Sequence, residues 1–88
     1  MSPRTKQAAR SLGLRIQELR RAAGETQEGF AGRVGMLAPN YARIEQGRAN
    51  VTIDTLVRVA HGLKVELAEL FVVPRVKRAK PGRPPSAE

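Results

Sequence analysis

The sequence contains no cysteine and no tryptophan, and its 88 residues include only one tyrosine and two phenylalanines. Without cysteine, neither a disulfide framework nor a thiolate metal site can form. No apolar run approaches the roughly 20 residues that a membrane-spanning helix needs. Met1 is not followed by the apolar segment of a secretory signal. We therefore expect a single cytoplasmic domain with one modest core and no membrane association.

Residue types that carry catalysis or bind metals are few and scattered. His61 is the only histidine, and no cysteine or cluster of carboxylates lies near it. The acidic residues form no spaced pair, the serines have no neighbouring base, and no glycine-rich loop suited to cradling phosphate is present. We expect neither a metal, nor a cofactor, nor an enzymatic activity.

Positive charge is abundant, with 16 Lys and Arg against 8 Asp and Glu and a net charge of +8. Residues 1–17 hold four basic residues and no acidic one, and residues 73–88 hold five basic and one acidic, whereas residues 18–72 hold seven of each. Basic ends on a nearly neutral body suit a polyanion such as DNA or RNA. The alternative is that these ends only keep the protein soluble.

Apolar residues recur at helical spacing, and no segment alternates apolar and polar residues as a strand does. The pattern predicts an all-α fold of five helices. The first runs from about residue 8 to 23, the second follows the N-cap Thr26 and ends at residue 34, and the third spans residues 38–46 after a tight turn at Gly35. A fourth follows the cap Thr52, and a short fifth contains Leu67. We divide the chain into a basic N-terminal segment (1–7), a domain (8–73) and a Pro-rich basic tail (74–88) predicted to be disordered.

Two short helices joined at a glycine are typical of proteins that place a helix in the major groove of DNA. Over about sixty residues the chain resembles the Cro/repressor-type helix-turn-helix domain of the XRE family of bacterial and phage regulators. The residues that carry the resemblance are Leu12, Gly13, Ile16, Leu19, Arg20, Gly24, Thr26, Gln27, Glu28, Phe30, Ala31, Val34, Gly35, Tyr41, Arg43, Ile44, Glu45, Gly47, Asn50, Thr52, Leu56, Ala60, Leu63, Val65, Leu67, Leu70 and Phe71.

The resemblance implies roles for particular residues. Arg20 and Glu45 look like the family's buried ion pair, which links the first helix to the recognition helix; the alternative is two solvated charges. Arg43 is the best candidate for reading a base, because arginine donates two hydrogen bonds to guanine, with a phosphate contact as its competing role. Asn40 could meet adenine or a phosphate. Ala38 and Pro39 occupy positions that resemble base-reading sites, where they could touch only a thymine methyl.

Five further residues are expected to contact the DNA backbone, which adds affinity without sequence information. They are Thr26 and Gln27 at the start of the second helix, and Arg48, Asn50 and Thr52 after the third. Leu37 departs from the family, which often has a capping Ser or Thr there, and Lys64 stands where the family usually has glycine.

The resemblance implies a sequence-specific transcriptional regulator that binds double-stranded DNA as a homodimer on a palindromic operator, in a bacterial cytoplasm and on the nucleoid when bound. Leu67, Leu70 and Phe71 resemble the family's dimer surface, although they could instead close the monomer core. The alternative function is a protein-interaction module, such as an antitoxin-like or coactivator-like domain with a protein partner. Nonspecific nucleic-acid packaging through the basic ends is a third hypothesis.

Overall fold

The computed structural model describes residues 1–75, and residues 76–88 lie outside the part that it describes. Within residues 1–75 every regular element is helical, as the apolar spacing predicted. The elements are α1 (Pro3–Ala22), α2 (Gln27–Arg33), α3 (Ala38–Glu45), α4 (Ile53–Leu63) and a 3-10 helix, η1 (Leu67–Phe71). The predicted fifth helix is therefore a 3-10 turn rather than an α-helix. Most of the tail predicted to be disordered falls outside the described residues.

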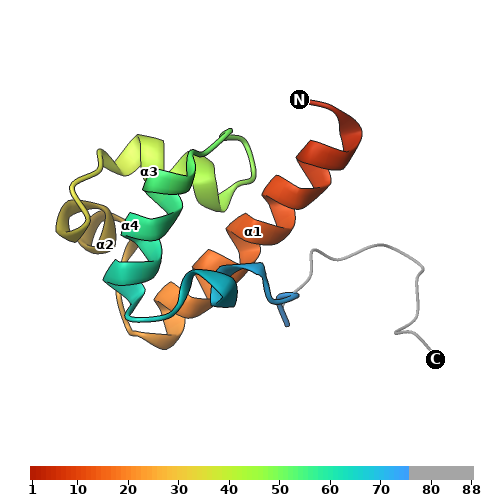
Figure 1. The fold of residues 1–88 in the computed structure, drawn as a ribbon. Helices are drawn as coiled ribbons and strands as arrows, with labels where there is room; N and C mark the ends of the chain where they lie inside the picture. Colours follow the sequence, from red (N-terminus) through yellow and green to blue (C-terminus); the bar gives the residue numbers. More distant parts are fainter. Residues whose placement is uncertain (76–88) are drawn as a thin grey trace, which may run out of the picture.

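The first helix begins at Pro3, not near Ala8 as predicted. Ser2 caps it, because its hydroxyl accepts a hydrogen bond from the amide of Thr5 at 3.1 Å, and Pro3 fits the first turn, where no amide hydrogen is missed. Residues 3–7 of the segment assigned to a basic N-terminus therefore belong to the start of α1. Figure 1 shows α1 as one long helix, with α2, α3 and α4 gathered around its C-terminal half.

The core is a single cluster of mostly aliphatic side chains contributed by all five elements. Phe30 and Tyr41 are its only aromatic members. The buried residues are Ile16, Phe30, Ala31, Val34, Tyr41, Ile44, Leu56, Val59, Ala60 and Leu70. Because the buried residues of α3 and α4 are spaced three and four apart, the apolar spacing of the sequence located most of the core correctly.

Close backbone packing of α1 against α3 determines where α3 lies. Gly13 of α1 is buried, and a Cβ added there would lie 2.5 Å from the carbonyl oxygen of Glu45 at the end of α3. Only glycine allows two helix backbones to approach this closely. The end of the described chain also packs on α1: Pro74 is buried, and the amide of Arg75 donates to Glu18 Oε2 at 2.9 Å.

Candidate nucleic-acid interface

The helices α2 and α3 are joined by a short turn at Gly35, whose φ of 74° lies in the left-handed region that favours glycine. The amide of Met36 donates to the carbonyl of Ala31 at 2.8 Å, which closes the end of α2. Phe30 and Tyr41, both fully buried, pack their rings with centroids 5.2 Å apart and planes inclined by 55°. The turn and the ring contact together fix the relative position of the two helices.

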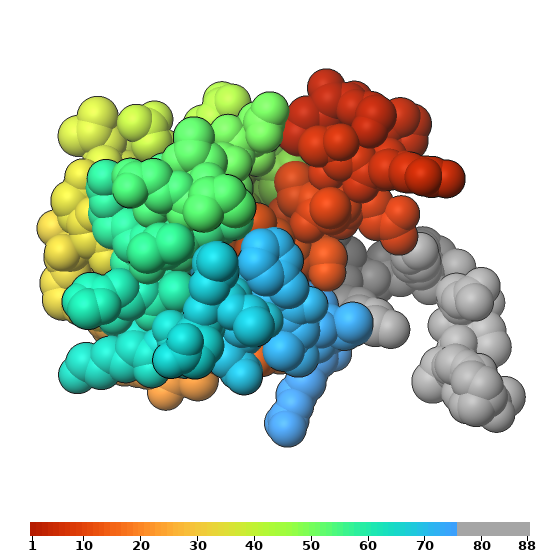
Figure 2. All heavy atoms as spheres, in the orientation of Figure 1, coloured from red at the N-terminus to blue at the C-terminus, as the bar shows by residue number. Residues whose placement is uncertain are grey.

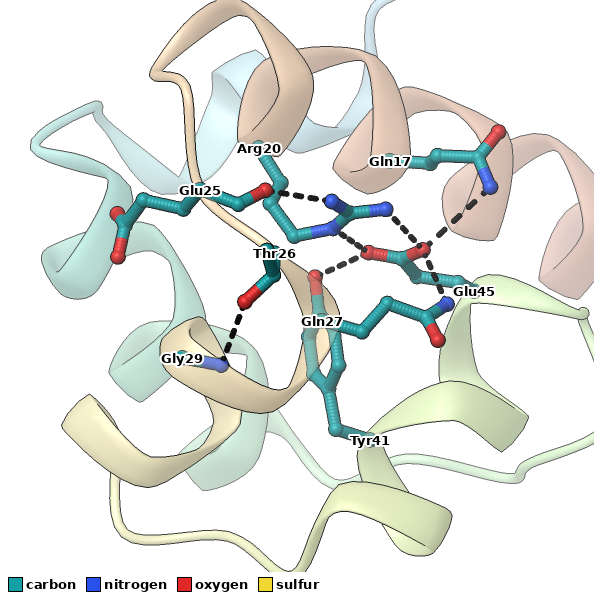
Figure 3. A network of polar contacts seen from close by, with 8 residues as sticks. All are labelled: Gln17, Arg20, Glu25, Thr26, Gln27, Gly29, Tyr41 and Glu45. Carbon is teal, nitrogen blue, oxygen red and sulfur yellow. Dashed lines mark hydrogen bonds and ion pairs between the residues drawn. The ribbon is translucent and has the colours of Figure 1, made fainter.

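A buried carboxylate, that of Glu45, connects α3 to both helices before it (Figure 3). Arg20 of α1 donates from Nε to Oε2 at 2.7 Å and from Nη2 to Oε1 at 3.1 Å. Gln27 of α2 donates to Oε1 at 2.8 Å, Gln17 donates to the same oxygen at 3.5 Å, and the Tyr41 hydroxyl donates to Oε2. The structure thus brings Arg20 and Glu45 together as a bidentate pair, with side chains only 7% and 1% exposed.

The charge state of this network follows from its geometry. Burial alone would raise the pKa of Glu45, but the hydrogen bonds from Arg20, Gln27 and Tyr41 outweigh burial and hold that pKa below its ordinary value. The bond to Glu45 raises the pKa of Arg20, and burial followed by the same carboxylate raises the pKa of Tyr41. Arg20 also donates from Nη1 to the carbonyl of Glu25 at 2.6 Å. The network is therefore ionised and fully bonded near neutral pH.

The outer face of α3 carries the residues predicted to read bases. Pro39, Asn40 and Arg43 are exposed, whereas Ala38 is half-buried and packs against the core. The guanidinium of Arg43 donates weakly to the carbonyl of Arg48, at 3.4 Å, and within residues 1–75 it meets no carboxylate. Ala38 is thus less available to DNA than the sequence suggested, while Arg43 keeps most of its donors free.

The five residues predicted to touch the DNA backbone divide into two groups. Arg48 and Asn50 are exposed, and within residues 1–75 their side chains make no hydrogen bond to the protein. By contrast, the hydroxyls of Thr26 and Thr52 cap α2 and α4 by accepting from the amides of Gly29 and Thr55. The fifth residue, Gln27, points inward, because its side-chain amide already donates to Glu45 Oε1.

A shallow hollow of about 230 Å³ separates α3 from the start of α4, and its lining includes Asn40, Arg43, Asn50 and Thr52. Leu37, which precedes α3, caps it with no side-chain hydrogen bond, as its sequence suggested, and is 72% exposed. Leu37 is thus an exposed apolar residue at the tip of the α2–α3 pair, and it was not among the residues predicted to contact DNA. Its position directly before Ala38 and Pro39, two predicted base-reading residues, could have indicated that it lies near the DNA.

The residues predicted to form a dimer surface do not share one environment. Leu70 is fully buried within the chain, so its assignment to a dimer surface is wrong: it closes the core. Leu67 is half-buried against that core, whereas Phe71 is 58% exposed. Phe71 continues into exposed Val72 and Val73, and Ile53 and Val57 of α4 are also exposed apolar residues. Of the three predicted residues, Phe71 is thus the most exposed, and the sequence analysis did not include its exposed neighbours Val72 and Val73.

Other kinds of site were also sought in residues 1–75. No group of three His, Cys, Asp or Glu side chains there is arranged to hold a metal ion. None of the described helices is long and apolar enough to cross a membrane.

Comparison with known proteins identifies the fold. The model of a helix-turn-helix domain family matches residues 11–71. The control protein C.MunI of a Mycoplasma species is 33% identical over 60 residues, covering 67% of this chain and 81% of the relative.

Two solved structures resemble the chain closely. The restriction-modification controller protein C.AhdI from Aeromonas hydrophila superposes with a TM-score of 0.70 at 33% identity, over 72% of this chain and 96% of that protein. A hypothetical transcription factor, NHTF from Neisseria, superposes with a TM-score of 0.71 at 22% identity, over 80% and 82%, and supports the fold alone. The chain therefore belongs to the helix-turn-helix domain family, in the Cro/repressor-type form that its sequence resembles.

Proposed function

We propose that this protein is a transcriptional regulator that binds double-stranded DNA as a homodimer, with α3 in the major groove of a palindromic operator. The observation that carries this proposal is the division of α3 into two faces. Tyr41 and Glu45 fix the helix from its buried side, and Arg43 and Asn40 are exposed on the other side, with most of the Arg43 donors free. A rigid helix with an exposed, arginine-bearing face is suited to base-edge recognition.

The relatives favour a particular class of regulator. The two relatives at 33% identity are described as a control protein and as a restriction-modification controller protein. We therefore favour a controller role for this chain over an antitoxin role, and we expect no enzymatic activity.

Dimerisation is part of the proposal because one exposed helix face buries little surface on DNA. The exposed apolar residues Phe71, Val72 and Val73 are suited to a two-fold contact between copies. A two-fold dimer would place its recognition helices in half-sites about one helical turn, roughly 34 Å, apart.

The deciding experiment is selection of bound sites from a random DNA pool at a stated salt concentration. We expect a palindromic preference, and we expect Arg43→Ala to relax it at one base position per half-site, with a loss of about 1–3 kcal/mol of discrimination. Arg48→Ala is the matched control, because a phosphate contact should weaken all sequences alike. If the two variants lose affinity evenly across the pool, Arg43 does not read a base. If scrambled DNA competes as well as any selected site, the protein packages nucleic acid without specificity.

The alternative, a protein-interaction module, is favoured only by the same exposed apolar surface around Phe71. Light scattering coupled to size exclusion separates the two functions. A homodimer that retains DNA binding supports the regulator. If the protein is a monomer and binds none of the DNA sequences, the result supports the protein-interaction module, whose apolar surface contacts a different protein.

A further inference from the structure

The N-terminal turns of α1 extend beyond the family's shared domain. The family match begins at residue 11, whereas α1 begins at Pro3. These added turns carry Arg4, Lys6 and Arg10, and no acidic residue occurs before Glu18. This chain therefore presents a positively charged helical segment that the match does not include.

Backbone packing fixes this segment beside the end of the recognition helix. Gly47, which follows α3 with a φ of 73°, is buried against Arg10. A Cβ added at Gly47 would lie 2.7 Å from the Cα of Arg10, so α1 and the turn after α3 touch through their main chains. Figure 2 shows the first turns of α1 (red) directly beside the green atoms of the segment after α3. Arg10 is thus held next to Arg48, one residue beyond Gly47.

A pocket of about 310 Å³ lies at this junction. Its lining consists of Met1, Lys6, Arg10, Gln46, Gly47 and Arg48, which includes three cationic side chains and no acidic one. All three cations are exposed, and within residues 1–75 none of them forms an ion pair or a side-chain hydrogen bond.

Four arginines elsewhere in residues 1–75 have a counter-charge. Arg15, Arg20, Arg33 and Arg58 each pair with a carboxylate. Three cations gathered without a counter-charge repel one another, and an anion placed between them removes that repulsion. The pocket is therefore suited to an anion.

We propose that this pocket binds backbone phosphate of the operator duplex, on the flank of the bases that α3 reads. The inference rests on the proposed function and adds a contact surface to it. A duplex is favoured over a small free anion because the pocket cations are exposed and Arg48 lies within reach of Arg43 on the reading face. Arg48 belongs to the pocket, and the guanidinium of Arg43 reaches the carbonyl of Arg48. The pocket thus lies beside the end of α3.

The test compares Arg10→Gln with Arg21→Gln on a selected operator. Both arginines are exposed residues of α1, and Arg21 does not line the pocket. Each lost phosphate contact lowers the slope of log affinity against log salt by about 0.9. When salt is raised from about 50 to 200 mM, affinity falls for both proteins. The fold-decrease should be about 3.5 times smaller for Arg10→Gln than for the unmodified protein. Lys6→Gln should act in the same direction, Arg10→Lys should retain the slope, and Arg21→Gln should leave it unchanged.

A second arm identifies the phosphate. In this arm, each operator of a series carries one uncharged methylphosphonate, placed at a different phosphate. The unmodified protein should bind more weakly when the replaced phosphate flanks the bases that α3 reads. Arg10→Gln should not show this loss. A pocket for a small free anion would show no such position, and that result overturns the proposal, as would equal slopes for Arg10→Gln and Arg21→Gln. If the unmodified protein prefers an operator but these effects are missing, only the pocket assignment fails. If it binds no duplex, the proposed function fails with it.

Discussion

Replacing Glu45 by glutamine tests how α3 is held in place. The substitution keeps the size of the side chain and removes its charge. Every group that faces the carboxylate is a donor: the Arg20 guanidinium, the Gln27 and Gln17 amides and the Tyr41 hydroxyl. A glutamine amide would direct its own NH₂ group at these donors, so at least one hydrogen bond becomes a donor–donor clash.

The expected magnitude follows from burial. Arg20 is 6% exposed and Glu45 2% exposed, so the variant leaves a guanidinium charge without its counter-charge inside the protein. Removing one partner of a buried ion pair costs about 3–5 kcal/mol. Small domains are stable by about 5–15 kcal/mol in total, so Glu45→Gln should lose a large fraction of the stability. At about 4–8 °C per kcal/mol, Tm should fall by at least about 12 °C.

Urea denaturation followed by circular dichroism measures this loss, and a double variant supplies the control. In Arg20→Met/Glu45→Leu both charges are replaced by apolar groups of similar size, which is often neutral or stabilising. The double variant should therefore be more stable than Glu45→Gln, because only neutral donors such as those of Tyr41 and Gln27 lose their acceptor and no buried charge is left unpaired. If Glu45→Gln costs less than about 1 kcal/mol, the pair is solvated in solution and does not anchor α3.

Three further predictions concern pH, packing and assembly. Because its hydrogen bonds outweigh burial and hold the pKa of Glu45 below the ordinary 4.5, the carboxylate stabilises the fold fully above that pH. That stability is lost as pH falls further, so an acid titration of Tm should be steeper for the unmodified protein than for Glu45→Gln. Gly13→Ala should lose about 1–3 kcal/mol in urea denaturation, because its Cβ would meet the backbone of α3, whereas Gly32→Ala, with open space around it, should be neutral or stabilising. Phe71→Ser should shift the protein toward monomer in light scattering while its far-ultraviolet circular dichroism spectrum stays unchanged. If the variant becomes monomeric only because it has lost helix, Phe71 does not act through a dimer surface.

The sequence predicted the helical core well because period and burial are directly linked. Ile16, Phe30, Tyr41, Ile44 and Leu56 lie on the faces that apolar spacing assigned to the interior, and all are buried. The same logic failed at η1, where Leu70 and Phe71 are adjacent apolar residues. Spacing shows that a segment has an apolar face, but which residue the neighbouring helices cover depends on how those helices pack.

The start of α1 was available in the sequence and was misread. Ser2 followed by Pro3 is a cap followed by a favoured first-turn residue, yet the run of polar residues from Arg4 to Gln7 favoured a later start. The inward turn of Gln27 toward Glu45 had no comparable signal, because a residue at the start of a helix can face either solvent or a buried carboxylate in the next helix. Such contacts follow from tertiary packing rather than from local pattern.

The two sides of α3 also separate stability from recognition. Tyr41, Ile44 and Glu45 hold the helix in the molecule, and the exposed Pro39, Asn40 and Arg43 contribute nothing to that buried cluster. Substitutions on the outer side are therefore thermodynamically inexpensive. A library randomised at these three positions should remain largely folded, which makes the domain a scaffold for retargeting to new DNA sequences.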